Sequence, residues 1–196
     1  MKEQARKQVD WWLLEEDESW FHRFIQPHAY GWSDSLHPIK LIQQAFKRSM
    51  PDKAVSCFGA LCQDSQEILM DFAQGYPNSE QMWWVIVRLL RQAKQRGKKV
   101  MVLIWDNAPW HCSKRIRQWI RIYNQQAKQV DEVRLLVHWL PIKSPWLNPI
   151  EPYWGHAKRR VCEPSGQLSV AELRRRIRAQ FKALTLDDLL QLPDQL

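Results

Sequence analysis

The fold is decided by a stretch near the middle of the chain, Val100-Met101-Val102-Leu103-Ile104-Trp105-Asp106-Asn107. An unbroken apolar run of this length is typical of a β-strand that is covered on both faces. The run ends in one carboxylate, Asp106, where the turn residues Asn107 and Pro109 begin. Ligands of open α/β sheets usually bind beside the carboxyl ends of such strands. Asp106 is therefore the first candidate site residue.

The elements around this strand predict a mixed-sheet α/β fold. Short strand-like runs come first, and after residue 79 amphipathic helices alternate with strands. This order favours an antiparallel meander followed by parallel strands, with helices flanking the sheet. The predicted strands are 11–17, 20–24 (with a turn and return over 26–32), 54–62, 67–72, 100–106 and 133–140, and the predicted helices are 79–96, one capped by Ser113, 150–161 and one opened by Ser169 that buries Leu173, Ile177, Phe181 and Leu184.

The charge of the chain favours a polyanionic partner. The 196 residues carry a formal net charge of +8, with a pI of about 9.5. Residues 88–128 hold eleven Lys and Arg side chains but a single acid, Asp106. Nucleic-acid-binding domains have this kind of basic surface. The alternative for any one of these side chains is an ordinary solvated helix face.

The remaining composition points to a reduced, soluble protein. The four cysteines show no Cys-x-x-Cys pair and no zinc-ligand spacing, which favours free thiols. The polar N-terminus lacks the apolar stretch of a signal peptide, and no run approaches the length of a membrane helix. We expect a cytoplasmic, nucleoid-associated protein of a bacterium, with no membrane partner.

Two further acids join Asp106 as candidates. Asp17 closes the apolar run that starts at Trp11, and Glu151 stands at the start of a predicted helix. Three separated carboxylates of this kind are what a divalent-metal phosphodiester site needs, because they hold the ions that activate and stabilise the reacting oxygens. Each acid also has a structural alternative: Asp106 as a turn former, Asp17 in a solvated acidic tip, and Glu151 in a capping box begun by Asn148, against which Pro152 argues.

Two longer strings of sequence resemble a known family. The segments 102–111, with Asp-Asn-Ala-x-x-His, and 140–154, with Ser-Pro-x-Leu-Asn-Pro-Ile-Glu, are similar to the catalytic core of IS630-type transposases of the Tc1/mariner superfamily. Asp17-Glu18 with Gly31-Trp32 resembles the first motif of that family less distinctively. The resemblance implies an RNase H-like DDE catalytic domain over residues 1–165 and a C-terminal helical extension over 166–196. It assigns catalysis and metal binding to Asp17, Asp106 and Glu151, with two Mg²⁺ ions that Mn²⁺ can replace.

The resemblance also implies an activity and partners. A DDE transposase cleaves double-stranded DNA at the transposon ends and transfers the strand to target DNA, as a homodimer on the DNA. Family members usually carry N-terminal helix-turn-helix modules, and this chain begins almost at the first catalytic strand. We therefore expect those modules to be missing or supplied by a separate polypeptide. Two alternatives stay open: a catalytically silent remnant that only binds DNA, and a stand-alone RNase H-like nuclease.

Five further side chains are candidates for DNA contact. Lys143, Lys158, Arg159 and Arg160 flank Glu151 in the sequence, and His111 follows the second Asp. Lysine and arginine hold DNA through its phosphates, although plain surface charge is an equal alternative. For His111 the alternative is a structural histidine bonded within its loop.

Overall fold

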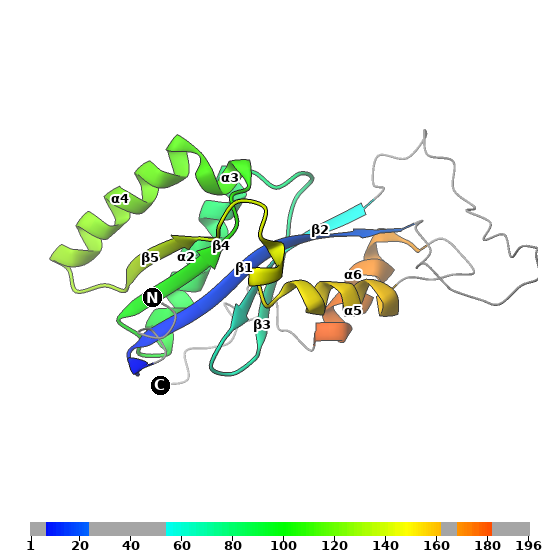
Figure 1. The fold of residues 1–196 in the computed structure, drawn as a ribbon, viewed down its shortest axis with the longest axis horizontal. Helices are drawn as coiled ribbons and strands as arrows, with labels where there is room; N and C mark the ends of the chain where they lie inside the picture. Colours follow the sequence, from blue (N-terminus) through cyan, green and yellow to red (C-terminus); the bar gives the residue numbers. More distant parts are fainter. Residues whose placement is uncertain (1–6, 24–53, 162–167, 182–196) are drawn as a thin grey trace, which may run out of the picture.

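Five strands form one mixed sheet, in the order β3-β2-β1-β4-β5, in the computed structural model, which describes residues 7–23, 54–161 and 168–181 (Figure 1). β1 pairs antiparallel with β2 and β2 with β3, whereas β1, β4 and β5 run parallel. The predicted meander followed by parallel strands is confirmed. The strands are β1 (Trp11–His22), β2 (Ala54–Cys62), β3 (Ile68–Phe72), β4 (Val100–Trp105) and β5 (Arg134–Trp139).

Three of the helices begin at the polar residues that predict them. Asn78 accepts hydrogen bonds from the amides of Glu80 and Gln81 to start α2, and Ser113 caps α4 through the amide of Ile116. Ser169 Oγ accepts from the amide of Glu172 at the start of α6. The helical elements are α2 (Ser79–Gln95), α3 (Pro109–Cys112), α4 (Lys114–Gln129), the 3₁₀ turn η1 (Pro145–Leu147), α5 (Glu151–Val161) and α6 (Val170–Phe181).

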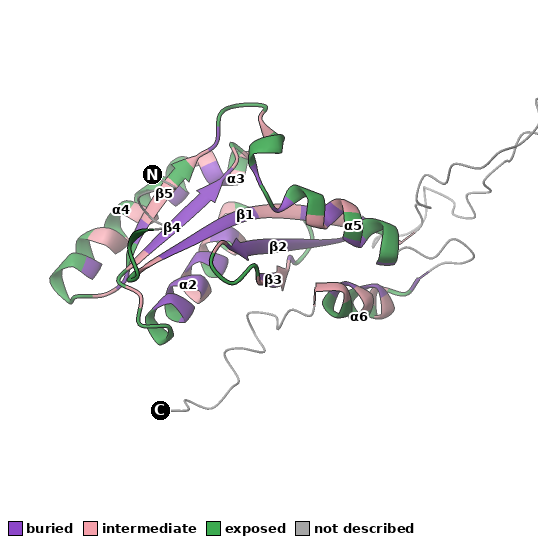
Figure 2. Ribbon diagram, turned by 60° about the horizontal axis from the view of Figure 1, so that its bottom comes forward, coloured by how far each residue is buried: buried purple, intermediate pink, exposed green. Residues whose placement is uncertain are grey.

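The sheet buries both of its faces, as Figure 2 shows for β1, β2 and β4. On one face Trp12 and Leu14 of β1 pack with α2 and with Ile116 of α4. On the other face Phe21 and its neighbours pack with α5 and α6. Successive side chains of a strand point to opposite faces, so β1 contributes to both cores.

The first strand is longer than the sequence predicts. β1 continues without a break from Trp11 to His22, so the prediction of a separate strand beginning at Trp20 is wrong. Asp17 lies in the middle of β1, opposite Gly59 of β2, and does not close a strand. Pairing with β2 along its length overrides the local acidic pattern that resembles an exposed tip. The predicted return over 26–32, with Gly31 and Trp32, and the predicted burial of Leu184 lie outside the described residues.

α6 packs into the same core as the sheet. Leu168, Leu173 and Ile177 are buried beside α5 and β2, in one cluster with Phe21 and Trp154. A domain boundary at residue 165 stays a prediction. Among residues 7–23, 54–161 and 168–181, no helix combines the length and the apolar character that crossing a bilayer requires.

Candidate active site

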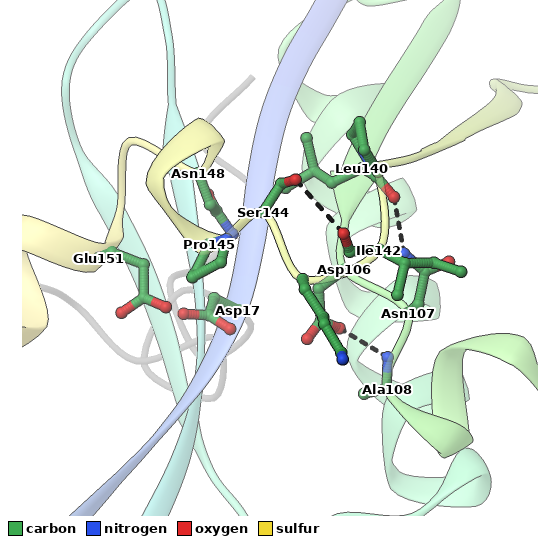
Figure 3. A pocket seen from close by; sticks show the side chains of 12 residues that line it. Asp17, Asp106, Asn107, Ala108, Leu140, Ile142, Ser144, Pro145, Asn148 and Glu151 are labelled. Carbon is green, nitrogen blue, oxygen red and sulfur yellow. Dashed lines mark hydrogen bonds between the residues drawn. The ribbon is translucent and has the colours of Figure 1, made fainter.

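The three predicted acids line a single cavity of about 250 Å³ (Figure 3). Asp17 comes from β1, Asp106 directly follows β4, and Glu151 is the first residue of α5. The parallel register pairs Glu15 with Ile104, so two residues further along each chain Asp17 lies level with Asp106. In Figure 3 the carboxylates of Asp17 and Glu151 reach toward each other, and Asp106 lies on the far side of the cavity. The fold thus gathers acids that are far apart in the sequence.

The loop between β5 and α5 carries Glu151 to this cavity. Asn107 Nδ2 donates to the carbonyl of Leu140 at 2.6 Å, which ties the start of the loop to the end of β4. Asn148 is buried and donates from Nδ2 to the carbonyl of Glu16 at 3.0 Å, which ties the end of the loop to β1. Asn148 Oδ1, the atom that would cap α5, accepts no hydrogen bond among the described residues, so the capping-box alternative is wrong. Glu151 itself stands at the helix N-terminus, where the helix dipole favours a negative charge.

Asp17 is held by the neighbouring helix α5. Trp154 Nε1 donates to Asp17 Oδ2 at 3.0 Å. Gly59 makes room for this indole, because a Cβ atom there would lie 2.5 Å from the Trp154 ring. Burial, followed by the negative charges of Glu151 and Glu18, raises the pKa of Asp17 to about 7. Asp17 therefore resists ionisation until a cation compensates its charge.

Asp106 is held through one of its two oxygens. Oδ1 accepts from the amide of Ala108 at 2.8 Å and lies 2.8 Å from His111 Nδ1. Burial works against ionisation, but the hydrogen bonds from His111 and Ala108 outweigh it and lower the pKa of Asp106. The bond to Ala108 is the turn-forming contact considered as an alternative role for Asp106, so the turn and the place at the cavity occur together.

His111 lies behind Asp106 and is fully buried. Its Nε2 lies 3.2 Å from Glu16 Oε2 and 3.0 Å from Glu18 Oε1, at ion-pair distances but without the alignment of a good hydrogen bond. Burial alone would lower the pKa of His111, but the charge of Glu16 and the bond to Asp106 raise it well above its usual range. The ring presents no surface to solvent, so the prediction that His111 contacts DNA does not fit. The burial of His111 and its bond to Asp106 agree instead with the alternative, a structural histidine bonded within the protein.

The donor set of the cavity suits a hard divalent cation. Its ionisable ligand groups are carboxylates, and Mg²⁺ or Mn²⁺ prefers such oxygen ligands. The carboxylates also repel one another, a conflict that a cation would remove. A second cluster that could hold a metal ion, formed by Glu16, Glu18 and His111, projects from the opposite face of β1 and does not line this cavity.

The basic candidates divide into two groups. Lys143 lines the cavity and adopts a left-handed backbone with φ of 57°. Lys158, Arg159 and Arg160 are exposed on the C-terminal half of α5, about 10–14 Å along the helix from Glu151. All four side chains are exposed to solvent, one at the cavity and three on α5. A DNA contact by each of them stays a prediction.

Sequence reasoning did not find the supporting roles of five residues around the acids: Glu16, Glu18, Gly59, Asn148 and Trp154. A glycine inside a strand does signal a close approach of another group, so Gly59 could have been found. The partner of Gly59, Trp154, carries no such signal.

The fold and the cavity together define an RNase H-like domain of the DDE type, with acids supplied by two parallel strands and a following helix. The model of the DDE superfamily endonuclease family matches residues 17–173. The chain belongs to this family, whose members act with divalent metal ions.

One sequence and two solved structures are similar to this chain, the structures in fold. The Transposable element Tcb2 transposase of Caenorhabditis briggsae is 41% identical over 69 residues, which are 35% of this chain and 22% of the relative. The structure is similar to that of the Mos1 transposase paired-end complex with left transposon end, with a TM-score of 0.63, 16% identity, and coverage of 99% of this chain and 56% of that chain. The Mos1 Strand Transfer Complex gives a TM-score of 0.63 and 15% identity, covering 89% and 48% of the two chains. The chain thus spans about half the length of these Mos1 chains.

Proposed function

We propose that this chain is the catalytic domain of a Tc1/mariner-type transposase, which cuts double-stranded DNA at transposon ends and joins the released 3′-hydroxyl to target DNA. One observation carries the proposal: Asp17, Asp106 and Glu151, separated by up to 134 residues (151 − 17), line one cavity on a fold shared with Mos1 transposase. DNA complexes of Mos1 make DNA the expected partner.

In this proposal Asp17, Asp106 and Glu151 hold two Mg²⁺ ions, which Mn²⁺ can replace. Bound ions of this kind activate the attacking oxygen and stabilise the leaving one. The protein's own part is to fix the three carboxylates. Trp154 holds Asp17, the Ala108 amide holds Asp106, and the helix N-terminus supports Glu151.

The basic surface is the proposed grip on the DNA backbone. Lys143 at the cavity and the three cations of α5 would contact phosphates near the reacting one, and α4 adds five Lys and Arg without any acid. Such binding is largely independent of sequence and weakens steeply with salt. Recognition of the ends is left to a helix-turn-helix region or a separate polypeptide, and the active species is a homodimer on DNA in the cytoplasm of a bacterium.

The test is DNA cleavage and strand transfer in Mn²⁺. We expect the chain to nick supercoiled plasmid. We also expect it to join a duplex with a free 3′-hydroxyl end, made from the DNA that flanks the gene, to the plasmid as target. Asp106→Asn or Glu151→Gln should lower both rates by more than the roughly 10- to 100-fold that loss of an outer metal partner costs. The matched control is Glu80→Gln, an exposed acid on α2, which should behave as wild type.

The same experiment separates the two rival functions. A stand-alone nuclease would hydrolyse DNA but never join the 3′-hydroxyl to a second duplex. A silent remnant would bind DNA without cutting it. Equal activity of wild type and Asp106→Asn would show that the reaction does not depend on Asp106, which would contradict the proposal.

A further inference from the structure

We propose that His111 is a positioning residue, which with Glu18 behind it fixes the Asp106 carboxylate relative to Asp17, so that one Asp106 oxygen is presented to the metal. The inference rests on the proposed function and extends it to residues that do not line the cavity. His111 does not line the cavity that would hold the ions, and its fully buried side chain does not reach the DNA.

The first link is the geometry around Asp106. Both hydrogen-bond contacts of this carboxylate, from the Ala108 amide and from His111 Nδ1, fall on Oδ1 at 2.8 Å. Oδ2 has no hydrogen-bond partner within the described residues, and half of the side chain is exposed to the cavity. Because a carboxylate oxygen accepts, Nδ1 must carry its hydrogen and donate it. His111 therefore selects which oxygen of Asp106 faces the ions.

The second link holds His111 itself. Its ring stacks on Trp105, with centroids 4.5 Å apart and planes within 8°. Its Nε2 lies 3.0 Å from Glu18 Oε1, and Trp110 Nε1 donates a hydrogen bond to that same oxygen. The ring is thus fixed by β4, by α3 and by the back of β1.

The third link connects two of the acids that line the cavity. Neighbouring side chains of a strand point to opposite faces, so Asp17 faces the cavity while Glu16 and Glu18 face His111. A displacement of Asp106 away from Asp17 would have to break the contacts of His111 with β1. Second-layer partners that orient metal-binding carboxylates act in this way in other metal sites.

The test uses two variants, each of which keeps only one of the two contacts of the imidazole, that of Nδ1 with Asp106 or that of Nε2 with Glu18. In His111→Asn the side-chain amide takes the place of Nδ1 and can still donate to Asp106. In His111→Gln the longer amide takes the place of Nε2 and reaches the Glu18 side only. Both variants remove the ring from Trp105, so both should lower the melting temperature by similar amounts. Mn²⁺ affinity, measured by calorimetry on the whole chain without DNA, distinguishes them.

We expect His111→Gln to weaken Mn²⁺ binding by about 10- to 100-fold. His111→Asn keeps the bond to Asp106 and loses only the contact with Glu18, so its Mn²⁺ affinity should fall between that of His111→Gln and that of wild type. If the two variants lose affinity equally, in step with their melting temperatures, His111 is only structural and the inference is wrong. Trp110→Phe, at a partly exposed position, tests the network from its outer end should either His111 variant fail to fold. It should weaken Mn²⁺ binding measurably, and an unchanged affinity would contradict the inference.

Failure of the positioning role can be distinguished from failure of the proposed function. If wild type binds no Mn²⁺, the metal site and the positioning role both fail. If wild type binds Mn²⁺ and loses it in Asp106→Asn, while His111→Gln binds as wild type does, only the positioning role is excluded.

Discussion

At the scale of single residues, one indole N–H connects two parts of the cavity. Trp154 is buried on α5 and donates to Asp17 on β1, while Glu151 lies one turn earlier on the same helix. A hydrogen bond to a charged group contributes about 1.5–3 kcal/mol. The bond also lowers the pKa of Asp17 against the effects of burial and of nearby acids.

Trp154→Phe should therefore weaken Mn²⁺ binding at pH 8 by about 10- to 150-fold, the factor to which that energy range corresponds. The phenyl ring keeps most of the packing but cannot donate. Trp12→Phe is the matched control, because Trp12 is fully buried and its Nε1 has no partner among the described residues. Calorimetric titration measures both. Equal losses in the two variants would show that aromatic packing, not the hydrogen bond, supports the site.

At the scale of elements, the contact between β2 and α5 depends on one missing side chain. Gly59 lies opposite Asp17, and a Cβ atom there would approach the Trp154 ring to 2.5 Å and Ile150 to 3.2 Å. Glycine in a strand interior marks such close approaches. The place of α5 over the sheet therefore depends on Gly59.

Gly59→Ala should lower the free energy of unfolding by about 1–3 kcal/mol, as overpacking of a core does, and should displace Trp154 from Asp17. Gly155→Ala, inside α5, meets nothing closer than 4.0 Å and should instead stabilise the helix by about 0.5–1 kcal/mol. Urea denaturation monitored by circular dichroism compares them. A neutral Gly59→Ala would mean that α5 can move off the sheet without cost.

The elements also show what the sequence can and cannot predict. β4 and the helix caps follow from local patterns, because apolar runs and cap residues act on their immediate neighbours. Asp17 does not end a strand as its local pattern predicts, and its grouping with Asp106 and Glu151 comes from the family resemblance. The extent of β1 does not follow, since Glu15 and Glu16 are buried by strands distant in the sequence. The bond from Trp154 to Asp17 spans 137 residues, and no spacing rule predicts a contact of that kind.

At the scale of the whole molecule, the buried acids make the metal-free protein sensitive to pH. The pKa values of Asp17 and Glu16 are raised by burial to about 7 and about 8, and that of His111 is raised by Glu16. All three groups bind protons more tightly in the folded chain than in the unfolded one. Between pH 5 and pH 8 the folded state therefore holds more protons, and the free energy of unfolding falls as pH rises.

In EDTA we expect a lower melting temperature at pH 8 than at pH 5.5. Asp17→Asn should reduce the difference, because it removes one of the three groups, and Mn²⁺ should reduce it as well by compensating the ionised carboxylates. Differential scanning calorimetry at the two pH values provides the measurement. A melting temperature that rises toward pH 8 without metal would contradict the pKa shifts.

The alternation of β1 has a consequence for how the gene can change. Asp17 faces the cavity while Glu16 and Glu18 face the histidine behind it, and β2 and β4 hold the strand on both edges. Loss or gain of one codon between Trp11 and Asp17 would turn these acids over and exchange the two faces. A change of two codons would keep them. Insertions or deletions in this part of β1 therefore keep the acids on their faces only when they add or remove an even number of residues. Substitutions at single positions would not reveal this constraint.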